Sequence, residues 1–152
     1  MFFLIIAGTF IIDQASKAVV QALMGQGESI AVAPPFFYFT YIQNPGAAFG
    51  LLAYQTTLFV TITVLLVAGV LLGYRKISPG RRTLQYGLGL IVGGALGNMV
   101  DRLRFGKVVD FLDFRVWPVF NLADTAIVIG AFLLVLVLMK DTGKKPKRER
   151  GF

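Results

Sequence analysis

The chain has 152 residues, of which 56% are hydrophobic and only 15% are charged, and its formal net charge is +7. Its mean hydropathy of +0.72 is too high for a water-soluble domain of this size, because such a domain could not bury so much apolar surface. The absence of cysteine and histidine excludes disulfides, the common zinc sites and the histidine-dependent machinery of serine and cysteine proteases. The sequence therefore predicts a small integral membrane protein with one domain, 1–152.

Four segments are long and apolar enough to cross a bilayer, which takes about 20 residues per helix. In chain order they cover about 1–24, 54–74, 83–100 and 121–139. The first segment has no basic start and no small-residue cleavage site, so it is interpreted as a permanent span. In the third span, Gly89, Gly93 and Gly97 recur at every fourth position and predict a surface for close helix packing. The predicted fold class is an all-α membrane protein with four transmembrane helices.

Basic residues are concentrated in two segments. The connection 75–82 carries four of the fifteen lysines and arginines, and the tail 140–152 carries six. Because positively charged segments stay in the cytoplasm, both termini and this connection are predicted to be cytoplasmic. The loops 25–53 and 101–120 then face outward. The basic tail is interpreted as a topology anchor that also meets anionic lipid. Nucleic-acid binding is not expected, since the tail lacks the interleaved aromatic and basic residues of a nucleic-acid-binding surface.

The outer segment 25–53 has the pattern of β-structure. Residues 28–33 predict a short strand, and Pro34-Pro35 interrupt it. Residues 36–42 are aromatic and β-prone, and Asn44-Pro45-Gly46 predicts a turn. A small sheet on the membrane surface accommodates this pattern. Its aromatic side chains either contact lipid or a lipidated ligand, or only cover the end of the helices.

Polar side chains in or beside membrane spans are costly, and they therefore indicate function. On the predicted topology most of them lie near one depth, the outer interface, although they come from separate parts of the chain. This set comprises Asp13, Lys17, Asn44, Asn98, Asp101, Arg102, Asp110, Asn121 and Asp124. The four-residue spacing of Asp13 and Lys17 predicts an ion pair on one helix. Asn98, Asp101 and Arg102 share one helix face and are expected to hold the third span against its neighbours.

Asp110 and Asp124 lie in apolar surroundings, and neither has an obvious basic partner on its own segment. Two carboxylates brought together in such a place share one proton, which is the arrangement of an aspartic protease. Asn121, one turn before Asp124, would orient a carboxylate or the substrate. Asp113 competes with Asp110 for the same role, but it lies closer to the loop.

Other functions stay open from the residues alone. A proton-coupled transporter would use Asp13, Lys17 and Asp124 as a relay, and a non-catalytic assembly factor would need no carboxylate pair. A serine–lysine protease is poorly supported, because Ser16 and Lys17 are adjacent and point to different faces of a helix. A metalloprotease would need histidine or a larger acidic cluster.

Five motifs, in order along the chain, resemble those of one family, the lipoprotein signal peptidases (signal peptidase II). The motifs are Asp13–Lys17 (DQASK), Asn44–Gly50 (NPGAAFG), Gly93–Arg102 (GGALGNMVDR), Val108–Phe111 (VVDF) and Phe120–Ile127 (FNLADTAI). Each motif is weak alone, but their order on four predicted spans is specific.

The resemblance implies an aspartyl endopeptidase of the bacterial inner membrane, with four membrane helices and a small outer β-cradle. Such an enzyme removes signal peptides from prolipoproteins by cutting before the diacylglyceryl-modified cysteine. It uses no cofactor or metal, and the cyclic peptide globomycin is expected to inhibit it. We expect it to act as a monomer.

The resemblance also implies roles for individual residues. Asp110 and Asp124 occupy the positions of the catalytic pair. Supporting roles fall on Asp13, Lys17, Asn44, Gly46, Gly94, Asn98, Asp101, Arg102, Asn121 and Ala123. The connection between Asp110 and Asp124 is shorter than in many members of the family. In the family this loop lies over the active site, so we expect either the range of substrates or the closing of the loop to differ.

Overall fold

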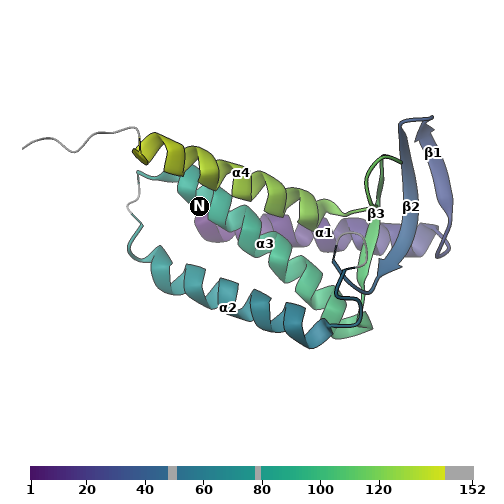
Figure 1. The fold of residues 1–152 in the computed structure, drawn as a ribbon, viewed down its shortest axis with the longest axis horizontal. Coiled ribbons are helices and arrows are strands. Elements are labelled where there is room, and N and C mark those ends of the chain that lie inside the picture. Colours follow the sequence, from purple (N-terminus) through teal and green to yellow (C-terminus); the bar gives the residue numbers. More distant parts are fainter. Residues whose placement is uncertain (48–50, 78–79, 143–152) are drawn as a thin grey trace, which may run out of the picture.

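Four long helices run side by side, and a three-stranded sheet lies across one end of them, as Figure 1 shows for this computed structural model. The structure describes residues 1–47, 51–77 and 80–142. Its elements are α1 (Phe2–Leu23), β1 (Ser29–Ala33), β2 (Phe37–Asn44), α2 (Thr56–Tyr74), α3 (Arg82–Phe105), β3 (Val108–Asp113) and α4 (Leu122–Thr142). Residues 48–50 of the second motif and most of the predicted basic tail, 143–152, lie outside the described residues.

Among the described residues, α1, α2 and α4 are the helices long and apolar enough to cross a membrane. Only 6% of the apolar window of α2 is buried, so this helix presents its apolar side chains outward, as contact with lipid requires. The predicted third span, 83–100, lies within α3. This helix is less apolar because it carries the buried polar residues Gln85, Asn98 and Asp101. It packs against α1, α2 and α4, so its polar groups are covered by protein.

Glycines allow α3 to approach two helices closely. A Cβ atom added to Gly93 would lie 2.7 Å from the Cβ of Thr9 on α1, and one added to Gly89 would lie 2.9 Å from Ile5. This confirms the predicted packing surface. A second contact faces α4, where a Cβ on Gly130 would lie 2.5 Å from the carbonyl oxygen of Gly87.

The helix α3 continues to Phe105, beyond its predicted end at residue 100. It stops at Gly106, which has a φ of 70° and caps the helix in the left-handed conformation. The chain then enters β3, whereas the sequence placed 101–120 in an outer loop. That expectation was wrong for 101–105 and 108–113, because β3 is a short apolar run whose partner strand, β2, lies far earlier in the chain.

The sheet is antiparallel with the order β1-β2-β3. The predicted strand at 28–33 and the aromatic segment 36–42 correspond to β1 and β2, although β2 extends to Asn44. In the second pair, Tyr38 lies opposite Asp113 and Asn44 lies opposite Val108, with an irregularity between Phe39 and Ile42. The register therefore brings the end of β2 alongside Asp110.

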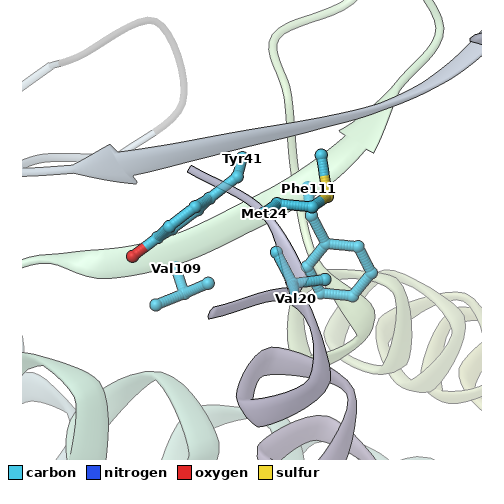
Figure 2. Close-up of a cluster of buried hydrophobic side chains, with 5 residues drawn as sticks. All are labelled: Val20, Met24, Tyr41, Val109 and Phe111. Atoms are coloured by element: carbon cyan, nitrogen blue, oxygen red, sulfur yellow. The ribbon is translucent and has the colours of Figure 1, made fainter. Parts of the chain in front are cut away.

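A buried apolar cluster fastens the sheet to the end of α1. It consists of Val20, Met24, Tyr41, Val109 and Phe111 (Figure 2). Because side chains alternate along a strand, Val109 and Phe111 face this cluster while the residue between them faces the opposite side of the sheet. The apolar packing thus sets the direction of the Asp110 side chain.

The glycine contact between α3 and α4 makes a testable prediction. Gly130→Ala should lower the free energy of unfolding by about 1–3 kcal/mol, because the added methyl group overlaps with the Gly87 carbonyl and with Ile91. Thermal unfolding in detergent measures the effect. Gly69→Ala is the matched control, since nothing lies within 4 Å of the added atom on α2. Equal melting temperatures for both variants would contradict the proposed packing.

Candidate active site

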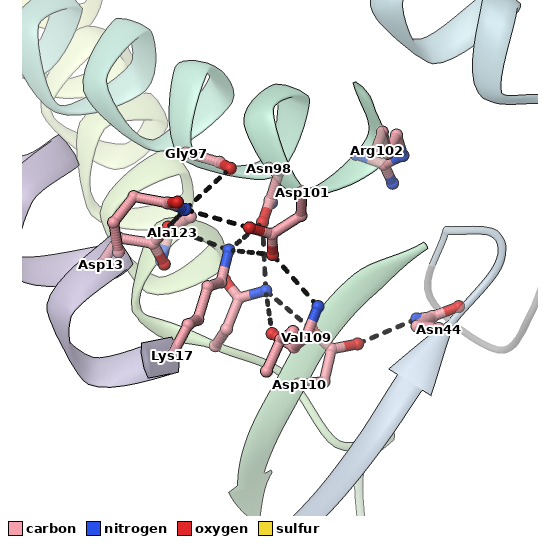
Figure 3. A network of polar contacts seen from close by, with 12 residues as sticks. Asp13, Lys17, Asn44, Gly97, Asn98, Asp101, Arg102, Val109, Asp110 and Ala123 are labelled. Carbon is pink, nitrogen blue, oxygen red and sulfur yellow. Dashed lines mark hydrogen bonds and ion pairs between the residues drawn. The ribbon is translucent and has the colours of Figure 1, made fainter. Parts of the chain in front are cut away.

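The polar residues selected from the sequence meet where the sheet crosses the helix ends. Figure 3 labels seven of them, Asp13, Lys17, Asn44, Asn98, Asp101, Arg102 and Asp110. The selected residues are connected to one another through hydrogen bonds, ion pairs and close packing. The connected set comprises Asp13, Lys17, Asn44, Gly46, Gly94, Asn98, Asp101, Arg102, Asp110, Asn121, Ala123 and Asp124.

Asp124 is positioned by the first turn of α4. The side-chain oxygen of Asn121 accepts a hydrogen bond from the Asp124 N–H at 2.9 Å, and Asp124 Oδ2 accepts one from the Asn121 N–H at 3.4 Å. This reciprocal pair is a capping box, in which the residue before the helix and its third residue satisfy each other's N–H groups. The other carboxylate oxygen, Oδ1, accepts a hydrogen bond from Asn98 Nδ2 at 2.8 Å.

Asp110 is positioned by β3 and by two amide side chains. Asn121 Nδ2 donates to Asp110 Oδ1 at 2.6 Å, and Asn44 Nδ2 donates to Oδ2 at 3.0 Å. Asn121 also donates to Asn98 Oδ1 at 3.1 Å. One asparagine therefore contacts both carboxylates, and a second, Asn98, holds Asp124 and is held by Asn121.

Asp110 and Asp124 line the same small cavity. Its volume is about 40 Å³, which is enough to admit a water molecule. The other lining residues are Asn44, Gly46, Ala47, Asn98, Arg102 and Val108. Within the described part of the chain, no three acidic, cysteine or histidine side chains gather as they would around a metal ion. The arrangement can hold a water molecule between two carboxyl groups.

The environment of Asp110 favours its protonated form. Burial raises the pKa of Asp110 to about 7, and the neighbouring charge of Asp124 acts in the same direction. The hydrogen bonds from Asn44 and Asn121 and the charge of Lys17 oppose this increase. Near neutral pH the side chain can therefore hold a proton that an ordinary aspartate would have lost.

Lys17 is the centre of a buried charge network next to the cavity. Its ammonium group lies 2.9 Å from Asp13 Oδ2 and 2.9 Å from Asp101 Oδ2, and it donates to Asn98 Oδ1 at 2.9 Å. The predicted ion pair of Asp13 and Lys17 is confirmed. Since Lys17 is only 2% exposed, the charges of its partners compensate for its desolvation.

The two carboxylates bound to Lys17 also hold the backbone beside the candidate catalytic pair. Asp13 Oδ1 accepts a hydrogen bond from the N–H of Ala123 at 2.9 Å, and Asp101 Oδ2 accepts one from the N–H of Val109 at 3.1 Å. The next residues in the chain are Asp124 and Asp110. The charge network therefore positions both candidate carboxylates through their preceding residues.

The remaining predicted residues act through packing and backbone contacts. Arg102 donates to the carbonyl of Gly46 at 3.0 Å and stacks over the ring of Phe59, 4.3 Å from its centre. Gly94 lies against α4, where an added Cβ would be 2.5 Å from the Ala123 carbonyl oxygen. Arg102 thus connects α2 to the turn after β2, and Gly94 lets α3 approach the beginning of α4.

Asp113 does not belong to the carboxylate pair. It is three residues beyond Asp110 on the same strand, so the two side chains leave opposite faces of the sheet. Its carboxylate accepts a hydrogen bond from Thr40 at 2.7 Å and lies 3.5 Å from Arg115 Nε. The preference for Asp110 over Asp113 therefore has a geometric reason.

Gln14 is a member of the network that the sequence analysis missed. Its Nε2 donates to Asp101 Oδ1 at 3.0 Å and to the Gly97 carbonyl at 3.2 Å. The signal was present, because Gln14 lies directly between the motif residues Asp13 and Ala15 on a membrane helix. An uncharged amide at that depth has the same need for partners as the neighbouring charges.

An apolar groove on α4 leads to Asp124. Its volume is about 400 Å³. The lining residues are Phe114, Trp117, Phe120, Asp124, Thr125, Val128 and Ile129. Asp124 is the acidic residue among them, so one carboxyl group contacts both the polar cavity and an apolar surface.

Comparison with known proteins identifies the family. The model of the family described as "Signal peptidase (SPase) II" matches residues 5–140. The chain belongs to the signal peptidase II family. The lipoprotein signal peptidase of Pelotomaculum thermopropionicum is 66% identical over 97% of this chain and 97% of its own length. That of Moorella thermoacetica is 52% identical over 88% and 89%, respectively.

Solved structures support the same assignment. One bacterial membrane enzyme superposes with a TM-score of 0.91 and 34% sequence identity, over 99% of this chain and 94% of the other. A second has a TM-score of 0.84 and 35% identity, over 92% and 93%. The resemblance seen in the sequence motifs is therefore confirmed. Membership in the signal peptidase II family makes this chain a membrane protease of lipoprotein processing.

The charge network of this signal peptidase makes a testable prediction. Lys17→Met should lower the free energy of unfolding by about 3–5 kcal/mol, because it leaves the Asp13 and Asp101 carboxylates buried without their cation. Thermal unfolding in detergent at pH 7 measures this change. Lys76→Met, at an exposed position, is the control. A Lys17 variant as stable as the Lys76 variant would show that the network does not stabilise the fold.

Proposed function

We propose that this chain is an aspartyl endopeptidase that cleaves signal peptides from bacterial prolipoproteins, before the diacylglyceryl-modified cysteine. Asp110 and Asp124 are the catalytic pair in this proposal. The observation that carries it is the meeting of a buried carboxyl group from a strand and a half-buried one from a helix N-terminus at one cavity of about 40 Å³. Family membership and the printed names of the relatives support the reaction and the substrate.

The two carboxyl groups have complementary tasks in the reaction. The pair holds one proton and one negative charge, with the proton on Asp110, whose pKa is raised to about 7 by burial. The ionised carboxylate takes a proton from water, and the oxygen of that water attacks the carbonyl carbon that precedes the lipidated cysteine. The protonated carboxyl group donates to the carbonyl oxygen. The tetrahedral diol then collapses and the C–N bond breaks. The leaving amine receives the proton that the first carboxylate took from water, and a diol hydroxyl returns its proton to the other carboxylate.

The supporting residues keep this geometry in place. Asn44, Asn98 and Asn121 donate hydrogen bonds to the two carboxyl groups. As neutral donors they orient the oxygens without forming an ion pair that would hold both groups ionised. Arg102 lines the cavity and is available to bind the substrate backbone. No cofactor or metal takes part in this mechanism.

The substrate reaches the site from the membrane. In this proposal α3 crosses the membrane together with α1, α2 and α4, both termini are cytoplasmic, and the sheet lies at the outer surface of the bacterial inner membrane. The concentration of basic residues in 75–82 and 140–152 supports this orientation. The apolar groove beside Asp124 accepts the lipid-modified cysteine that follows the scissile bond. The chain acts as a single domain and a monomer, in contact with membrane lipid.

A proton-coupled transporter has weaker support. A relay across the membrane would need ionisable groups at several depths. The helix α2 has none, and α4 carries them only near its two ends. The polar residues instead gather at the end of the helices that carries the sheet, where they serve chemistry at one depth.

Replacement of either catalytic candidate tests the proposal. Asp110→Asn and Asp124→Asn should each reduce cleavage of a diacylglyceryl-modified prolipoprotein peptide by on the order of 10²- to 10⁴-fold, because one proton-transfer group is lost. Cleavage in detergent, followed by mass spectrometry, gives the rates. Asp141→Asn is the control, since this acid is exposed at the opposite end of α4 and pairs with Arg81.

The same assay defines the contrary result. A folded Asp110 or Asp124 variant that retains the parental rate would contradict the assignment of these two residues as the catalytic pair. An unmodified peptide of the same sequence should be cleaved poorly, and globomycin should inhibit cleavage of the lipidated one. Equal rates for both peptides would contradict the role of the lipid.

The raised pKa of Asp110 predicts the pH dependence. Cleavage should decline as the pH increases above about 7, because the pair then loses the proton that it donates to the carbonyl oxygen. An ordinary aspartate, with a pKa of 3.8, would lose this proton far below neutral pH. Measurement of kcat/KM between pH 5 and 9, at about one-unit intervals, gives the profile. A decline that is complete well below pH 6 would show that Asp110 does not hold the proton.

A further inference from the structure

Arg115, between β3 and α4, has an unusual backbone conformation. Its φ of 64° lies in the left-handed region, which residues other than glycine seldom adopt. Its backbone N–H donates to Asp113 Oδ1 at 2.8 Å and closes a tight turn at the end of β3. Such a conformation persists only where surrounding contacts hold it.

The Arg115 side chain reaches all three strands of the sheet. Its Nε lies 3.5 Å from Asp113 Oδ2 on β3. Its Nη2 donates to Ser29 Oγ on β1 at 2.8 Å. Its guanidinium group stacks on the ring of Tyr38 on β2, 3.7 Å from the ring centre. A planar group that forms hydrogen bonds and stacks at once is a property of arginine that lysine lacks.

A row of hydrogen bonds lies beside these contacts. Thr40 Oγ1 donates to Asp113 Oδ2 at 2.7 Å, and the hydroxyl oxygens of Ser29 and Thr40 are 2.8 Å apart. We call Ser29, Tyr38, Thr40, Asp113 and Arg115 the arginine clasp. None of its members forms part of the carboxylate cavity or of the charge network around Lys17.

Two aromatic residues near Arg115, Phe114 and Trp117, line the groove that leads to Asp124, and we call them the aromatic wall. Arg115 itself does not line the groove. The ring of Phe114 lies 4.9 Å from that of Phe37 on β2 and 5.9 Å from that of Phe120. The clasp therefore holds the aromatic wall between the sheet and α4.

We infer that Arg115 is a positioning residue for substrate binding. Arg115 fixes the aromatic wall that receives the lipid-modified cysteine of the prolipoprotein. The inference rests on the proposed function. A wall that is already ordered spares the substrate the entropic cost of ordering it, so the clasp lowers KM. It leaves kcat unchanged, because Asp110 and Asp124 are oriented by Asn44, Asn98 and Asn121.

Steady-state cleavage of a diacylglyceryl-modified peptide in detergent tests this role. Arg115→Ala should increase KM by on the order of three- to tenfold. Its kcat should change by less than about twofold. Arg115→Lys should recover only part of the loss, because lysine supplies charge without the planar fork. Ser29→Ala removes one hydrogen bond and should increase KM less. The control is Arg104→Ala, which removes an exposed arginine outside the clasp and should leave both constants at their parental values.

A spectroscopic measurement reports on the wall without catalysis. Trp117 is the only tryptophan of the chain and lines the groove, so its fluorescence is specific for this surface. Arg115→Ala should make Trp117 more accessible to acrylamide quenching, and Arg104→Ala should not.

The outcomes separate the inference from the proposed function. A parent protein that does not cleave the lipidated peptide would overturn the proposed function and, with it, the substrate role of Arg115. If the parent protein cleaves the peptide but the Arg115 variants keep the parental KM, the inference alone is overturned. The same holds if the Arg115 variants leave Trp117 quenching unchanged. A fall in kcat at constant KM would also overturn it. If the alanine variant does not fold, Arg115→Lys and Ser29→Ala test the inference under the same criteria.

Discussion

One buried ammonium group organises the end of the molecule where the active-site candidates lie. Lys17 binds two carboxylates, Asp13 and Asp101, and none of the three charges would be stable alone in such a place. Each carboxylate then holds one backbone N–H, that of Ala123 or of Val109. The residues that follow these two are the candidate catalytic aspartates. A single compensated charge thus positions a helix and a strand that are remote in sequence.

The charge network around Lys17 and the candidate pair Asp110 and Asp124 use different chemistry. Lys17 pairs directly with the opposite charges of Asp13 and Asp101. Around Asp110 and Asp124, asparagine amides supply the hydrogen bonds. Neutral donors orient a carboxyl group but leave its charge uncompensated, so burial can raise the pKa of Asp110 to about 7. The two clusters lie side by side, and Asn98 contacts both.

The helices and the sheet divide the tasks of a membrane enzyme. The apolar surfaces of α1, α2 and α4 suit a lipid environment, while α3 supplies glycines for close packing and polar residues for the site. The sheet contributes Asp110 and, through its contacts with Arg115, holds the aromatic wall beside Asp124. Membership in the signal peptidase II family agrees with this combination of a membrane body and a polar site at one end.

Local patterns in the sequence were enough to predict the apolar helices, a small sheet with strand segments near β1 and β2, the glycine surface of α3, the ion pair of Asp13 and Lys17, and the candidate residues themselves. These features depend on spacing within one element, such as four residues along a helix. The strand β3, the role of Gln14, the clasp of Arg115 and the geometric reason for preferring Asp110 to Asp113 depended on the tertiary structure. Each of these is decided by a partner far away in the chain, and a pairing register across such distances leaves no periodic signal in the sequence.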